Sequence, residues 1–101
     1  MQREIAVLVA AITERRTIKN FYEPGSRLIE PHAIGYGSSG QVLLRAFQVE
    51  GASASGEHIN WKLFRLDRAE SIEPTDHAFD GPRPEYKRED RAMKRGIISQ
   101  L

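Results

Sequence analysis

Turn-forming residues cut this chain into short segments, and that division limits the folds open to it more than any other feature. Three stretches are rich in proline, glycine and small polar residues: Glu23-Pro24-Gly25-Ser26, Gly37-Ser38-Ser39-Gly40 and residues 51–56. Proline presets φ for a turn and glycine allows positive φ, so each stretch can reverse the chain. The spacing predicts short antiparallel strands joined by turns.

The segments between the turns have the residues of strands. β-Branched and aromatic side chains favour extended backbone at 16–22 and at 27–36, where Pro31 removes a hydrogen-bond donor and predicts an edge or a bend. Residues 41–50 carry apolar side chains on both faces, which predicts a central strand. A long strand is predicted over 59–73, ended by the proline that follows.

A helix is predicted over residues 2–15. Apolar side chains recur there at the spacing of one helical face: Ile5, Leu8, Val9 and Ile12. We expect this helix to lie against the sheet; the alternatives are the end of a longer helix that follows a preceding domain, and a dimerisation helix. Because a chain of 101 residues is too short for a two-sheet sandwich with a large core, we expect the strands to curl into a partly closed barrel. The predicted fold is mainly β, a small antiparallel β-barrel over residues 1–75 with the helix capping one open end.

The remaining residues, 76–101, are predicted to be a basic C-terminal extension. Residues 83–101 hold six Lys or Arg against three Asp or Glu, whereas the whole chain has fifteen against fourteen. Pro84 suits the first turn of a helix and Gly96 its end, so 85–95 forms either a solvated helix or a basic arm. An apolar end could latch onto the body or onto a second subunit: Ile97, Ile98 and Leu101.

Composition limits the class of protein. The chain has no cysteine, which excludes disulfides, thiolate catalysis and cysteine zinc sites, and makes the cytoplasm the expected compartment. No apolar run approaches the ~20 residues that span a bilayer, so we expect neither membrane insertion nor a signal peptide. A net charge of +1 is not that of a dedicated DNA-binding domain.

The stretch from Trp61 to Arg68 is the densest mixture of large apolar and cationic side chains in the sequence. With a period of two residues, Lys62 and Arg68 share one face of the strand, while Trp61 and Arg65 share the other. Charged tips on such a strand are either solvated or paired with a carboxylate such as Asp67, or they form a basic rim that holds an anionic ligand.

A small barrel would bring a further arginine beside that stretch. The candidate cations of an anion site are then Arg27, Lys62, Arg65 and Arg68. Several cations together with an aromatic ring suit a phosphate and a stacked base. Arg45 lies among apolar neighbours and faces either the lumen or the rim. Trp61 is either a stacking platform or part of the core.

Signals for an enzyme are weak, and we expect none. His32, His58 and His77 lack the spacing of metal ligands, so neither a metal nor a cofactor is predicted. Ser38 and Ser39 lie in a glycine turn without an identifiable base, so no catalytic nucleophile is predicted.

Four pieces of the sequence, within about residues 5–75, resemble the WYL domain, an Sm-like β-barrel module found mostly in bacterial transcription regulators. The matching pieces are Ile18-x-Asn20-x-Tyr22, Arg27-x-Ile29-x-Pro31, Leu44-Arg45-Ala46-Phe47 and Lys62-x-Phe64-Arg65-Leu66-Asp67-Arg68. The chain departs from the family at Val42-Leu43, where the naming Trp-Tyr pair would stand, and at Lys62, where the family prefers arginine. The family's helix-turn-helix is not expected here, because only fifteen residues precede the first predicted strand.

The resemblance implies an Sm-like barrel and a non-enzymatic sensor of an anionic nucleotide or single-stranded nucleic acid, which modulates transcription or a partner regulator. The family positions that this chain retains as candidate ligand-binding residues are Tyr22, Arg27, Lys62, Arg65 and Arg68. Arg45 and Trp61 join them on the argument from the residues. The alternative is a protein-interaction or dimerisation module with no small ligand, supported by the apolar C-terminal end and the missing aromatic pair.

Overall fold

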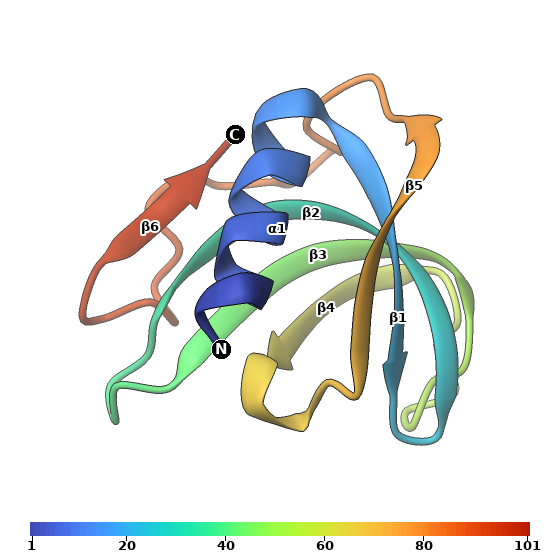
Figure 1. Ribbon diagram of the computed structural model, residues 1–101, viewed down its shortest axis with the longest axis horizontal. Helices are drawn as coiled ribbons and strands as arrows, with labels where there is room; N and C mark the ends of the chain where they lie inside the picture. The colour runs from blue at the N-terminus through green and yellow to red at the C-terminus, as the bar shows by residue number, and fades with distance from the viewer.

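The long strand β2 organises a six-stranded antiparallel sheet, which one helix covers (Figure 1). The computed structural model describes all residues, 1–101. Five strands follow one another across the sheet in the order β4-β3-β2-β1-β5, and β6 pairs with β2. The elements are α1 (Gln2–Glu14), β1 (Arg16–Tyr22), β2 (Gly25–Tyr36), β3 (Val42–Gly51), β4 (Asn60–Arg65), a 3-10 turn (Leu66–Arg68), β5 (Ser71–Ala78) and β6 (Ile97–Gln100).

Strand β2 changes its neighbour halfway along. Its first half pairs with β1 as far as Ile29, and its second half pairs with β6 from Ala33 onward, while β3 lies along its other side. Pro31 falls in the gap between the two partners, beside an irregularity in the ladder with β3. The missing N–H of a proline is tolerated there, and the edge or bend predicted at Pro31 is seen as an irregularity of the ladder.

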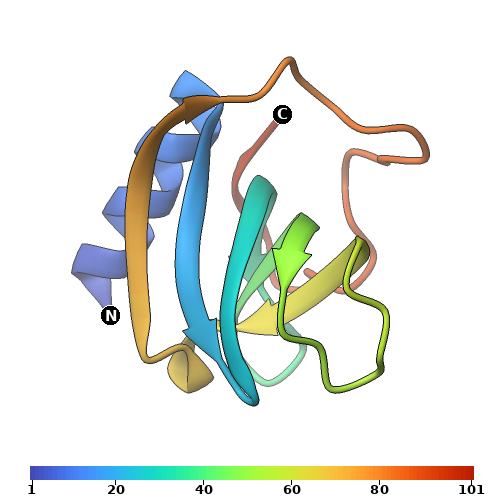
Figure 2. The ribbon, with the colours of Figure 1, turned by 90° about the vertical axis from the view of Figure 1, so that its right-hand side faces the viewer.

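The main core lies between the sheet and α1. Leu8 and Ile12 of the helix are buried against apolar side chains from five strands: Ile18, Ile29, Ile34, Leu44, Phe64 and Ile72 among them. Figure 2 shows α1 beside β1 and β5, on the flank of the curved sheet. A mainly β fold with an N-terminal helix against the sheet is thus confirmed. No ladder joins the end strands β4 and β5, so barrel closure stays a prediction.

The long strand predicted over 59–73 is wrong, because the chain forms two strands there. Strand β4 ends at Arg65, the 3-10 turn follows, and β5 begins at Ser71. The expectation that Pro74 ends the strand is also wrong, since β5 continues to Ala78. Pro74 is tolerated inside β5 because β5 is an edge strand with β1 as its single neighbour.

Residues 79–96, which we call the strap, contain no helix and no strand. The helix predicted over 85–95 is therefore wrong. Glu85 and Glu89 have positive φ values of 74° and 58°, which a right-handed helix does not admit. The alternative of a free basic arm is not seen either, since Phe79 and Met93 of the strap are buried.

Strand β6 confirms that the apolar C-terminal end latches onto the body. Ile98 and Leu101 pack against the main core, and Ile97 packs with Ala33 and Leu43 in a second, smaller cluster. The division into 1–75 and 76–101 stays a prediction, with β5 spanning its boundary. None of the helices has both the length and the apolar character needed to cross a membrane.

Candidate anion-binding pocket under the strap

The strap covers the face of β3 and β4 that points away from the main core, which we call the outer face. Trp61 of β4 pairs with Phe47 of β3, and Leu63 pairs with Arg45, whereas the next pair along the ladder, Phe64 and Leu44, is buried in the core. Successive side chains of a strand alternate between faces, so Trp61 and Arg45 both lie on the outer face. Arg45 is therefore not lumen-facing.

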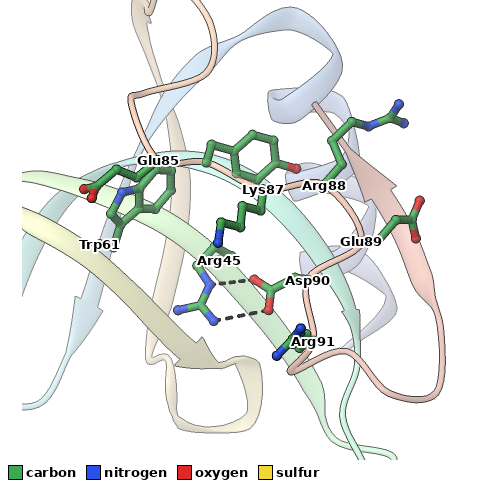
Figure 3. A pocket seen from close by; sticks show the side chains of 9 residues that line it. Arg45, Trp61, Glu85, Lys87, Arg88, Glu89, Asp90 and Arg91 are labelled. Carbon is green, nitrogen blue, oxygen red and sulfur yellow. Dashed lines mark hydrogen bonds and ion pairs between the residues drawn. The ribbon is translucent and has the colours of Figure 1, made fainter.

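A pocket of about 460 Å³ opens between the outer face and the strap. Figure 3 shows Arg45 and Trp61 on the sheet side and strap side chains on the other. The strap contributes a continuous run of lining residues, from Glu85 to Arg91. Two residues predicted to bind a ligand, Arg45 and Trp61, are thus brought into one pocket.

Aromatic rings form one wall of the pocket. Trp61 and Tyr86 are nearly parallel, with ring centroids 5.9 Å apart and an interplanar angle of 24°. On the sheet, His32 and Phe47 meet Trp61 edge-on at 4.7 Å and 5.4 Å. The indole N–H donates to the carbonyl of Pro84 at 3.3 Å. Trp61 therefore packs on the sheet and borders the pocket at once.

An ion pair forms the floor. The guanidinium of Arg45 donates from Nε and Nη2 to the two carboxylate oxygens of Asp90, at 2.6 Å and 3.2 Å. The backbone N–H of Ala92 donates to the same carboxylate at 3.0 Å. Hydrogen bonding to Arg45 lowers the pKa of Asp90, so this carboxylate is ionised at neutral pH.

Three exposed cations on the rim have no carboxylate partner: Lys87, Arg88 and Arg91. Of the nearby carboxylates, Glu85 is unpaired and Glu89 accepts from the side chain of Gln100. The rim thus holds three cations against two carboxylates, a net charge of +1. Sequence reasoning did not place these residues at the site. The excess of basic residues over 83–101 was the available signal, but nothing in the sequence indicated where the strap lies.

The strap is held over the outer face at Arg83. Its guanidinium makes two hydrogen bonds to the Glu30 carboxylate, at 2.8 Å and 3.0 Å, and lies 4.6 Å from the centroid of the Phe47 ring. Its backbone N–H donates to Nε2 of His32 at 3.1 Å. Hydrogen bonding to Glu30 raises the pKa of Arg83, as expected for a cation held by a carboxylate.

The remaining predicted residues lie elsewhere. Arg27 is buried, with its guanidinium 5.3 Å and 5.4 Å from the ring centroids of Tyr22 and Phe64. It donates to the carbonyls of Tyr22 and Glu23 and to the side chain of Gln48. Burial lowers its pKa. Arg27 therefore ties the β1–β2 turn to β3 from the core side of the sheet.

The cations of β4 and the 3-10 turn do not gather in one cluster either. Lys62 lies on the face opposite Trp61 and donates to the hydroxyls of Ser53 and Ser55. Arg65 is paired with Asp67 at 2.7 Å, and this pair raises the pKa of Arg65. Arg68 is exposed and unpaired. The prediction that Arg27, Lys62, Arg65 and Arg68 converge on one site is thus wrong.

No cluster of histidine and carboxylate side chains is arranged to hold a metal ion. Comparisons of the chain with protein-family models, with curated proteins and with solved structures find no match. The arguments for a function therefore come from the pocket under the strap.

Proposed function

We propose that this protein is a non-enzymatic ligand-sensing domain, similar to the WYL domain, that binds an anionic nucleotide or a short single-stranded nucleic acid in the pocket under the strap. The observation that carries the proposal is the pairing of an aromatic wall, Trp61 and Tyr86, with three rim cations that lack a partner. Ligand binding would change the contact with a partner regulator.

The chemistry of the pocket fits the two halves of a nucleotide. Aromatic rings stack on bases of any sequence, and each such contact contributes roughly 1–3 kcal/mol. Lys87, Arg88 and Arg91 supply the positive charge that phosphate requires. The volume of about 460 Å³ falls within the range of small-molecule sites.

The curved sheet supports an Sm-like barrel as the scaffold of this domain. One helix precedes five strands that follow a single path, and β4 and β5 at its two ends are joined by the short 3-10 turn. Such a scaffold presents the outer face of β3 and β4 to the strap, and the pocket lies between the two.

Binding of ATP and of a fluorescein-labelled single-stranded oligonucleotide tests the proposal. We expect the double variant Lys87→Ala/Arg91→Ala to bind at least about tenfold more weakly than the wild type, a loss of ~1.4 kcal/mol. The matched control is Lys19→Ala/Arg68→Ala, which removes the same charge from exposed, unpaired cations outside the pocket. Equal weakening in both variants, or no binding by the wild type at low salt, would overturn the pocket assignment.

A protein-interaction module remains the second candidate, supported by the free edge of β4. Strand β4 ends the sheet, and Ile59 and Leu63 beside that edge are 68% and 40% exposed. An edge strand with exposed apolar side chains can pair with another chain. Light scattering of the wild type and of Leu63→Lys separates the candidates, because a dimer that dissociates in the variant favours assembly. A point variant suits this test better than truncation, since truncation would remove β6.

A further inference from the structure

We propose that Asp90 occupies, in the free protein, the position on Arg45 that a ligand phosphate takes in the bound protein, so that ligand capture displaces Asp90 and opens the strap. This inference rests on the proposed function and adds to it the way in which binding changes the protein. It assigns Asp90 the role of an internal competitor.

The geometry of the ion pair carries the proposal. Figure 3 shows the Asp90 carboxylate facing the flat fork of Arg45 at the floor of the pocket. The two hydrogen bonds, at 2.6 Å and 3.2 Å, use the arrangement in which arginine also binds phosphate. The Arg45 side chain is 28% exposed, so a ligand in the pocket can reach it, whereas that of Asp90 is 10% exposed.

Electrostatics favour an exchange over simple addition. A phosphate that the rim cations draw into the pocket would lie near the Asp90 carboxylate, and two like charges around one guanidinium repel each other. The repulsion is removed if Asp90 turns away from Arg45. Asp90 would give up its hydrogen bonds from Arg45 and Ala92 for water, while the phosphate would take its place on Arg45.

The displacement would reach the second cluster on the outer face. Asp90 lies three residues before Met93, which is buried against Ala33 and Leu43. The backbone N–H of Met93 donates to the carbonyl of Asp90 at 3.0 Å, so the two residues belong to one turn. Moving Asp90 therefore loosens the turn that seats Met93, while Arg83 and β6 hold the strap on either side.

Titrations with ATP, followed by Trp61 fluorescence, test the exchange. We expect Asp90→Asn to strengthen binding by at least about tenfold, which corresponds to ~1.4 kcal/mol. Glu85→Gln is the matched control, since it removes the same charge from the same pocket but from a carboxylate with no cation partner. The general effect of that charge should strengthen binding by no more than about threefold. Equal effects of the two variants would overturn the role of Asp90.

Hydrogen exchange of the wild type gives a second readout that needs no variant. ATP should speed the exchange of the Ala92 and Met93 amides, because both are held by hydrogen bonds to Asp90. Unchanged or slower exchange on binding would overturn the proposal. If neither the wild type nor Asp90→Asn binds ATP or the oligonucleotide, the proposed function itself fails. If the wild type binds and Asp90→Asn behaves as Glu85→Gln does, only the exchange fails.

Discussion

The backbone N–H of Arg83 donates to Nε2 of His32 over 3.1 Å, and this contact fixes the protonation of a fully buried imidazole. Nδ1 of the same ring lies 2.8 Å from the carbonyl oxygen of Glu30, which can only accept. The ring proton must then sit on Nδ1, and the ring is neutral. His32 thus joins the strap to β2 only while Nε2 carries no proton.

Stability should fall below neutral pH because of His32. Burial lowers its pKa. Of the charged groups around the ring, Glu30 favours the protonated form and Arg83 opposes it. The unfolded chain has the ordinary histidine pKa of about 6.5 and binds more protons than the folded protein below that value, so the free energy of unfolding decreases as pH falls. The slope should approach ~1.4 kcal/mol per pH unit until the lowered folded-state pKa is reached.

Urea denaturation between pH 7.5 and pH 5 measures this slope, because that range brackets the ordinary histidine pKa of about 6.5. The matched variant is His32→Gln, which keeps hydrogen-bonding atoms but cannot titrate. We expect its stability to vary less over this range than that of the wild type. Identical slopes would show that His32 does not couple the strap to pH.

Replacing Gly35 with alanine should loosen the strap. A Cβ at Gly35 would lie 2.5 Å from the carbonyl oxygen of Gly96 and 2.8 Å from Sδ of Met93, so the strap must move away from β2. Overpacking of this kind costs roughly 1–3 kcal/mol. Urea denaturation should show that loss for Gly35→Ala, whereas Ser38→Ala in the adjacent exposed turn should change stability by less than about 0.5 kcal/mol. A Gly35→Ala protein as stable as the wild type would contradict the close approach.

Arg27 should prove necessary for the fold. Lysine at this position keeps the charge but cannot reach several acceptors at once, as the guanidinium does toward Tyr22, Glu23 and Gln48. We expect Arg27→Lys to lower the free energy of unfolding by about 1–3 kcal/mol, since buried acceptors lose their partners. Arg68→Lys is the control, because Arg68 is exposed and unpaired. Equal stability of the two variants would argue against the structural role.

Local sequence patterns were enough to predict the first half of the fold, from α1 to β3. The apolar stripe that includes Leu8 and Ile12 predicts α1, and the turns around Gly25 and Gly40 separate strands that the structure contains. The break at Leu66–Arg68 was missed because this 3-10 turn contains neither glycine nor proline to signal it. Pro74 misled the prediction because only pairing across the sheet shows that β5 lies at an edge.

The site was less predictable. Arg45 and Trp61 were predicted to bind a ligand, and both line the pocket. The strap that completes the pocket forms neither helix nor strand. Its anchors reach the outer face through tertiary contacts, since Phe79 and Tyr86 pack on His32 and Met93 packs against Leu43. Contacts between residues so far apart in the sequence are fixed by tertiary packing, which a pattern within one segment does not encode.

The change of neighbour along β2 also bears on how the protein folds. Ala33 pairs with Gln100, so the ladder on the far half of β2 stays incomplete until the last strand has been synthesised and has found its place. Contacts between such distant residues slow folding, as in other proteins of high contact order. A nascent chain emerging from the ribosome would expose one side of residues 33–35 as a free strand edge, open to association with other chains, until β6 arrives.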